Sequence, residues 1–118
     1  MNHWGRASIV TTGVEKCIEP HEGPAAPDYA LGRLVENIAR GLGMEVILND
    51  PPLQRETGNR SYRSLDEVLK ADIVTLHVPL IKEGFDTTLH LIGAEELAQL
   101  SPSSVLINAS RGEVVDNL

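Results

Sequence analysis

The stretch VLINASRGEVVD, residues 105–116, contains two apolar runs separated by small polar residues and an arginine. Its apolar opening is typical of a buried parallel strand, because both faces of such a strand are covered. Arg111 would then lie at the carboxyl edge of a sheet, where open α/β sheets bind their ligands. A guanidinium there offers two parallel donors suited to a carboxylate. An ordinary turn carrying a solvated arginine is equally compatible with this stretch alone.

On the N-terminal side of this stretch, segments with strand and helix patterns alternate. Ser64 and Glu67 have the spacing of a capping box, which predicts a short helix starting at Leu65. The predicted strands are residues 44–50, 71–76 and 104–108, the other predicted helices are residues 31–42 and 94–100, and a polar loop is predicted over residues 53–61. Such alternation predicts right-handed β-α-β units, and hence an α/β fold: a partial Rossmann-like, doubly wound parallel sheet of about four strands with helices on both faces.

Composition excludes several classes of protein. The net charge of −7 argues against a nucleic-acid binder, because neutralising phosphates requires clustered Lys and Arg. The single cysteine, Cys17, cannot form an internal disulfide, and no spacing of metal ligands involves it, so we expect no metal site. No apolar run reaches the length of a membrane helix, and the N-terminus lacks an apolar signal core. We therefore expect a cytoplasmic protein that has no membrane partner.

From Gly32 to Leu118 the chain resembles the NAD-binding domain of the D-isomer-specific 2-hydroxyacid dehydrogenases. The resemblance implies an oxidoreductase that uses NAD and a small 2-hydroxy acid. A narrower likeness, to the branch that oxidises 4-phospho-D-erythronate in vitamin B6 biosynthesis, rests on the segments Asn49–Pro52, Tyr62–Glu67, Thr75–Leu80, Lys82–Gly84 and Thr87–Leu91. Another D-2-hydroxy acid, such as glycerate or phosphoglycerate, is the alternative substrate.

The resemblance also implies roles for individual residues. Arg111 would be the catalytic arginine, which holds the substrate carboxylate and polarises the C2 oxygen. The residues expected to bind the cofactor are Gly32, Asp50, His77, Val78, Pro79, Ala109, Ser110 and Arg111. Asp50 ends a predicted strand, where an acid hydrogen-bonds the adenosine ribose and favours NAD over NADP. The alternative for Asp50 is a solvated acid at a strand end.

Gly32 takes the place of the third glycine of a dinucleotide-binding turn, which permits close packing of helix on strand. The first two glycine places would then be Pro27 and Tyr29. Proline has no amide hydrogen and tyrosine adds bulk, so this departure predicts weak cofactor binding. A competing alignment places Ala25–Pro27 and Val35–Glu36 in an earlier helix of the family and makes Gly32 a coincidence.

We divide the chain into an irregular segment, residues 1–31, and a partial NAD-binding Rossmann domain, residues 32–118. The first segment is compatible with a degenerate first strand, over Ala7–Gly13, and a loop. The family's acid–base histidine and glutamate would follow Leu118, so we expect a truncated chain that alone catalyses little. The alternative function is a non-catalytic nucleotide-binding or dimerisation remnant, and a homodimer is compatible with either.

Overall fold

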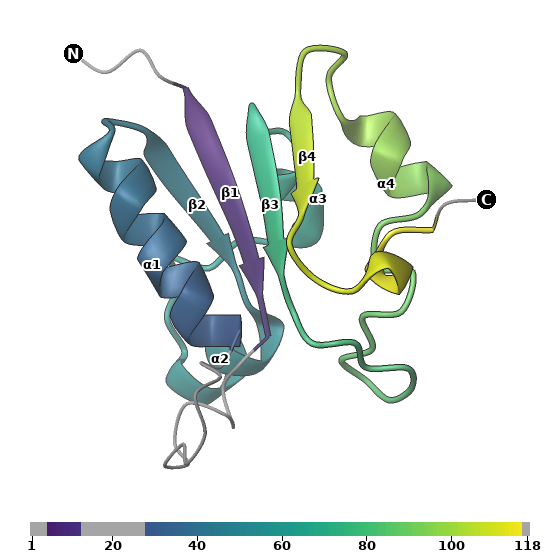
Figure 1. The fold of residues 1–118 in the computed structure, drawn as a ribbon. Coiled ribbons are helices and arrows are strands. Elements are labelled where there is room, and N and C mark those ends of the chain that lie inside the picture. Colours follow the sequence, from purple (N-terminus) through teal and green to yellow (C-terminus); the bar gives the residue numbers. More distant parts are fainter. Residues whose placement is uncertain (1–4, 13–27, 117–118) are drawn as a thin grey trace.

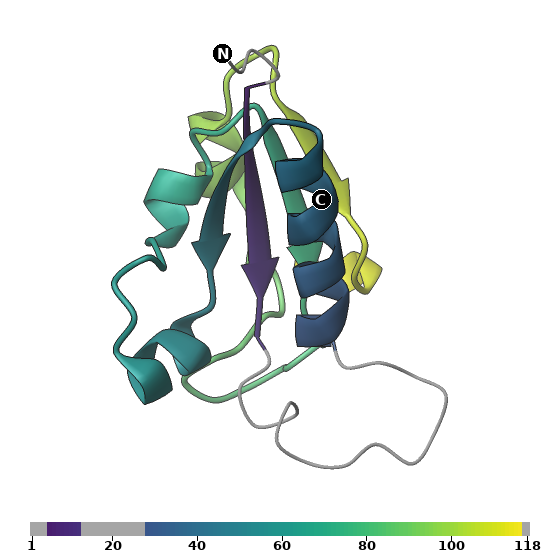
Figure 2. The same cartoon turned by 90° about the vertical axis from the view of Figure 1, so that its left-hand side faces the viewer.

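The computed structural model describes residues 5–12 and 28–116, with the side chains of the first helix described from residue 32. Four parallel strands form one sheet in the order β2-β1-β3-β4 (Figure 1). The elements are β1 (Arg6–Thr11), α1 (Asp28–Gly41), β2 (Glu45–Asn49), α2 (Pro51–Thr57), α3 (Leu65–Val68), β3 (Ile73–His77), α4 (Ala94–Gln99), β4 (Val105–Asn108) and the 3₁₀ turn η2 (Gly112–Val114). In Figure 2, α1 lies on one side of the sheet and α3 on the other, so the predicted fold class is confirmed.

Strand β1 lies at the centre of the sheet, although it comes from the segment expected to be mostly irregular. Its register places Val10 beside Asn49 of β2 and beside Leu76 of β3. All of its residues after Arg6 are buried. A central strand has neighbours on both sides, which explains why this short apolar run is covered despite its serine and its threonine.

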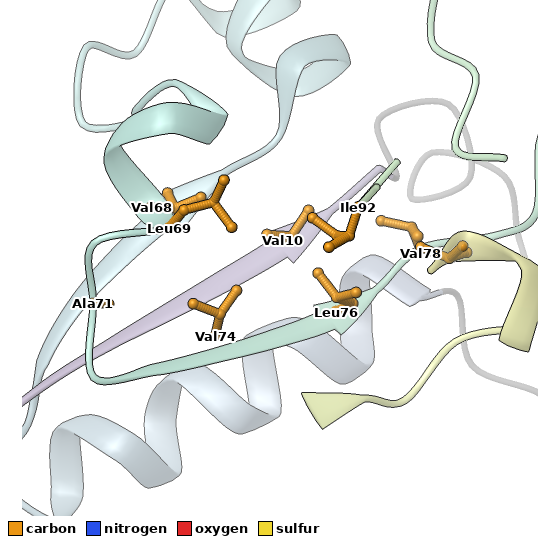
Figure 3. Close-up of a cluster of buried hydrophobic side chains, with 9 residues drawn as sticks. Val10, Val68, Leu69, Ala71, Val74, Leu76, Val78 and Ile92 are labelled. Atoms are coloured by element: carbon orange, nitrogen blue, oxygen red, sulfur yellow. The ribbon is translucent and has the colours of Figure 1, made fainter. Parts of the chain in front are cut away.

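The main apolar core fills the face of the sheet opposite α1 (Figure 3). Strand side chains on this face pack against α3, against the segment that follows β3, and against η2. The buried members are Val10, Val68, Leu69, Ala71, Val74, Leu76, Val78, Ile92 and Val114. Because strand side chains alternate between faces, residues 75 and 77 point to the α1 side instead. Within the described ranges, no helix combines the length and the apolar character that crossing a membrane requires.

One sequence expectation about burial is wrong. Strand β4 was expected to be covered on both faces, but Val105 and Ile107 are 51% and 45% exposed. In the described sheet β4 has one neighbour, and α1 does not extend over it. The apolar stripe of α1 is also partly open, since Leu34, Ile38 and Leu42 are each more than half exposed. An apolar groove of about 180 Å³ therefore runs between α1 and the strands.

Helix caps explain where the short helices begin. The predicted capping box is confirmed: Ser64 Oγ accepts from the backbone N–H of Glu67 at 3.3 Å, and Glu67 Oε1 accepts from that of Ser64 at 3.3 Å. The prediction of a polar loop over residues 53–61 is wrong in its first part, because α2 extends over Pro51–Thr57. Proline is well suited to a first helical turn, and Asp50 supplies the N-cap, a role that was not predicted from the sequence.

Gly32 brings α1 onto β1. A Cβ added at Gly32 would collide with Cγ2 of Thr11 and would lie 3.5 Å from Cγ2 of Ile9. Only glycine therefore permits this separation between helix and strand. The contact is the one that the third glycine of a dinucleotide-binding turn makes, and it favours that alignment over the competing one.

Ser8 provides a test of the core. Its side chain is fully buried, and its hydroxyl has no hydrogen-bond partner among the described residues. A buried, unpaired hydroxyl has lost its hydration without compensation. We expect Ser8→Ala to leave the free energy of unfolding unchanged or to raise it by about 1 kcal/mol in urea titrations. Ser104→Ala is the control, because the Ser104 hydroxyl donates to the Ala71 carbonyl at 3.1 Å and its loss should be destabilising. Destabilisation by Ser8→Ala would show that this hydroxyl has a partner.

The contact between Gly32 and Thr11 predicts a specific coupling. Gly32→Ala should lower the free energy of unfolding by about 1–3 kcal/mol through overpacking, partly offset by the helix preference of alanine. Thr11→Ser removes the methyl group that the new Cβ would meet, so Gly32→Ala should cost much less in that background. Gly41→Ala is the matched control, since a Cβ there meets nothing within 4 Å. Equal costs of Gly32→Ala in both backgrounds, measured as a double-mutant cycle, would contradict the contact.

Candidate functional site

The carboxyl ends of all four strands meet at one edge of the sheet, because the strands are parallel. The chain moves from β1 outward to β2, then crosses to β3 and outward to β4 on the other side. The winding therefore reverses between β1 and β3, and ligands of open α/β sheets bind at this kind of switch point. A cleft of about 250 Å³ opens at this edge. Its lining residues are Val10, Thr12, Asn49, Pro51, Pro52, Arg55, Phe85, Asp86, Thr87, Thr88 and Leu91.

Asp50 is fully buried beside this cleft, so the interpretation as a solvated acid is wrong. Its Oδ1 accepts from the backbone N–H of Leu53 at 3.0 Å, which caps α2. Its Oδ2 accepts from the hydroxyl of Thr11 at 2.6 Å. The carboxylate thus joins the ends of β1 and β2 to the start of α2. Both oxygens already accept a hydrogen bond, so a ribose hydroxyl would have to share an oxygen with Thr11 or with the helix cap.

Thr11 connects two of the predicted site residues. Its methyl group faces Gly32, and its hydroxyl donates to Asp50. Sequence reasoning missed Thr11, although a polar residue at the end of an apolar run is a usable signal. Tyr29 lies inside α1, whereas Pro27 lies outside the described residues. Since β1 ends at Thr11, the turn that directly follows the strand begins at Thr12 and not at residue 27.

The ends of β3 and β4 are joined by hydrogen bonds between predicted site residues. The backbone N–H of Val78 donates to Ser110 Oγ at 2.8 Å, and that hydroxyl donates to the Leu76 carbonyl at 3.1 Å. The N–H of Ala109 also donates to the Leu76 carbonyl, at 3.1 Å. The structure therefore places Val78, Ala109 and Ser110 in one continuous turn region, and Pro79 continues it. His77 is buried, with its Nε2 atom 2.9 Å from Thr75 Oγ1.

Arg111 is exposed at the carboxyl end of β4. Asn108, which sequence reasoning also missed, fixes this turn: its Oδ1 accepts from the N–H of Ser110 at 2.9 Å, and its Nδ2 donates to the Arg111 carbonyl at 3.0 Å. No acid of residues 5–12 or 28–116 forms an ion pair with the Arg111 guanidinium. A charged fork on a fixed backbone is therefore available to an anionic ligand.

Arg111 and Asp50 lie at the same edge of the sheet but are not in contact. They follow the outer strands β4 and β2, which are three spacings apart, or about 14 Å. Neither side chain is among those that line the cleft. The site thus has two parts. The cleft lies between α2 and the segment after β3, and the Arg111 turn lies at the end of β4.

Known proteins match this chain in sequence and in structure. The family model described as "D-isomer specific 2-hydroxyacid dehydrogenase, NAD binding domain" matches residues 30–118. Erythronate-4-phosphate dehydrogenase of Hydrogenovibrio crunogenus is 48% identical over 86 residues, which are 73% of this chain and 23% of that protein. The enzyme of the same name from Azotobacter vinelandii is 50% identical over 88 residues, 73% of this chain and 22% of that protein. The chain thus spans less than a quarter of these relatives.

Two solved structures share the fold at low sequence identity. The NAD-complexed D-isomer specific 2-hydroxyacid dehydrogenase of Lactobacillus delbrueckii ssp. bulgaricus has a TM-score of 0.66 and 30% identity, covering 95% of this chain and 29% of that chain. A D-lactate dehydrogenase from Treponema pallidum has a TM-score of 0.65 and 27% identity, covering 95% of this chain and 28% of that chain. These matches confirm the resemblance, and the chain belongs to the D-isomer specific 2-hydroxyacid dehydrogenase family through its NAD binding domain.

Proposed function

We propose that this chain forms part of an NAD-dependent enzyme that oxidises the 2-hydroxyl group of 4-phospho-D-erythronate, a step of vitamin B6 biosynthesis in the cytoplasm. The observation that carries the proposal is the exposed Arg111 at the ligand-binding edge of an NAD binding domain. The similarity to erythronate-4-phosphate dehydrogenases over 73% of the chain supports this substrate over glycerate or phosphoglycerate.

The described residues fit a dinucleotide along this edge. Gly32 permits the close packing that such a turn needs, and the cleft lies at the switch point of the sheet. Asp50 would face the adenosine ribose by sharing one of its carboxylate oxygens. Val78 and Pro79 would border the cofactor, and His77 would support that segment from within the sheet. When bound, NAD supplies the two-electron oxidation of the substrate C2 carbon.

Arg111 would act on the substrate itself. Its guanidinium would bind the carboxylate through two charge-assisted hydrogen bonds and would polarise the C2 oxygen. The small side chains of Ala109 and Ser110 leave room for the reacting groups to approach the backbone. Because Asn108 fixes the backbone of this turn, the point from which the Arg111 side chain extends is set before substrate arrives, which would be a positioning contribution to the rate.

A second candidate is a non-catalytic nucleotide-binding or dimerisation module. The apolar groove between α1 and the strands, bordered by the exposed side chains of Ile38, Leu42 and Ile107, favours association with another surface. A homodimer of this chain would cover this face. The two candidates differ in the role of Arg111, which the catalytic one requires and the second does not.

Titration calorimetry with NAD tests the cofactor site and the role of Arg111 together. We expect NAD to bind the wild-type chain, and to bind Arg111→Met more weakly because Arg111 is also expected to contact the cofactor. In the presence of NAD, the wild type should bind 4-phosphoerythronate about tenfold more tightly than Arg111→Met does, because a charge-assisted pair to the carboxylate contributes about 1.5–3 kcal/mol. The 118-residue chain is expected to bind without turnover. No heat and no thermal shift at millimolar NAD would overturn the proposal.

Asp50 predicts a preference between cofactors. We expect NAD to bind about tenfold more tightly than NADP, since a nearby carboxylate repels the additional 2′-phosphate. Asp50→Asn should narrow this difference, and asparagine is also a good N-cap, so α2 should persist. The measurement is the ratio of the two dissociation constants in each protein, with circular dichroism to check the fold. Equal affinities in the wild type would show that Asp50 has no part in the preference.

A further inference from the structure

The segment after β3 has a fixed base. Thr88 is buried, and its hydroxyl donates to the Pro79 carbonyl at 2.5 Å and accepts from the N–H of Ile81 at 2.8 Å. The hydroxyl of Thr87 donates to the Ile81 carbonyl at 2.7 Å, and the N–H of Thr88 donates to the same carbonyl at 2.8 Å. These bonds tie the two ends of the segment together. Residues 82–86, which we call the tip, extend beyond this base.

Arg55 of α2 joins the tip to the opposite wall of the cleft. Its Nη2 atom lies 2.5 Å from Asp86 Oδ2. Its Cζ atom lies 4.9 Å from the centroid of the Phe85 ring, within the range of a cation–π contact. One arginine therefore holds both an acid and an aromatic ring of the tip, and all three side chains line the cleft.

The exposure of Arg55, Phe85 and Asp86 indicates that the contacts between Arg55 and the tip are weak. The Phe85 residue is 87% exposed, and the side chains of Arg55 and Asp86 are 47% and 27% exposed. Ion pairs between exposed side chains contribute little and are screened by salt. Gly84 has a φ of 102°, a conformation that glycine adopts readily. The tip is thus closed by contacts that thermal motion or added salt can break, whereas its base remains fixed.

We propose that Arg55 is a positioning residue that latches residues 82–86 over the cleft and holds the Phe85 ring as a stacking wall for a nucleotide base. This inference rests on the proposed function, because it assigns the ligand to the same cleft. A nucleotide base can stack on an aromatic ring without forming specific hydrogen bonds, because every base has a flat π face. A ring held in place before binding loses less freedom when the ligand arrives, so the latch should raise affinity.

The first measurement concerns the latch alone. Hydrogen exchange of the Thr87 amide, whose N–H donates to the Gly84 carbonyl of the tip at 3.4 Å, is compared in the wild type, Arg55→Met and Asp86→Asn. We expect about threefold to tenfold faster exchange in both variants, as expected for the loss of a weak pair of contacts. Arg40→Met is the matched control, because Arg40 pairs with Glu36 on α1 and is similarly exposed but does not line the cleft. Exchange at the wild-type rate in both variants would overturn the latch.

The second measurement concerns the ligand. NAD should bind about fivefold more weakly to Arg55→Met and Asp86→Asn than to the wild type or Arg40→Met. Arg55→Lys should bind NAD more weakly than the wild type, because lysine loses the planar guanidinium. Its NAD affinity should still depend on salt, as that of the wild type does, because lysine keeps the positive charge. Raising the salt should weaken NAD binding more in the wild type than in Asp86→Asn. Unchanged NAD affinity beside faster exchange would overturn the positioning role. If the wild type binds no NAD, the proposed function fails, and the exchange data alone decide the latch.

Discussion

The side chain of Thr11 is the contact on which the candidate site depends. Its methyl group faces the bare backbone of Gly32, and its hydroxyl donates to the buried carboxylate of Asp50. One residue at the end of β1 thereby sets the distance to α1 and joins β1 to the start of α2. A larger residue at position 32 would move the helix away, and the buried carboxylate would lose one of its hydrogen bonds without the hydroxyl. The cleft exists where these elements converge.

The two parts of the edge are built in different ways. The cleft is a space between α2 and the segment after β3, and its outer wall is closed by exposed, weak contacts. The turn after β4 is held by side-chain hydrogen bonds of Asn108 and Ser110 to the backbone. Such bonds fix a local backbone shape and leave the Arg111 guanidinium exposed. This edge therefore combines a cleft wall that is held by weak contacts with a charged turn that is fixed by hydrogen bonds. Such an arrangement suits a long ligand that reacts at one of its ends.

Charge makes Arg111 more distinctive than its position alone. The protein carries a net charge of −7, so its overall charge repels an anionic ligand. The exposed Arg111 guanidinium, which forms no ion pair with the described acids, is instead a local positive charge that can attract such a ligand. Another arginine at this edge, Arg55, is already paired with Asp86. This contrast supports the two proposed roles, contact with the ligand for Arg111 and positioning of the cleft wall for Arg55.

The local pattern of the sequence was enough to predict the type and order of most elements after Gly32. Hydrophobic spacing, the capping box at Ser64 and the proline pair after β2 act over a few residues, and so they are visible along the chain. The turn around Arg111 was likewise readable, because its small residues and its arginine are consecutive. The family match followed from the same segments.

Tertiary structure alone decided which residues are covered. Asp50 is buried because Thr11, 39 residues earlier, lies beside it in the folded protein. Val105 and Ile107 are exposed because β4 has a single neighbour in the described sheet, although their apolar pattern matches that of a buried strand. A strand's own residues specify its alternation, whereas its burial depends on which strands and helices lie next to it. Those neighbours are distant in sequence, so the sequence pattern alone did not contain this information.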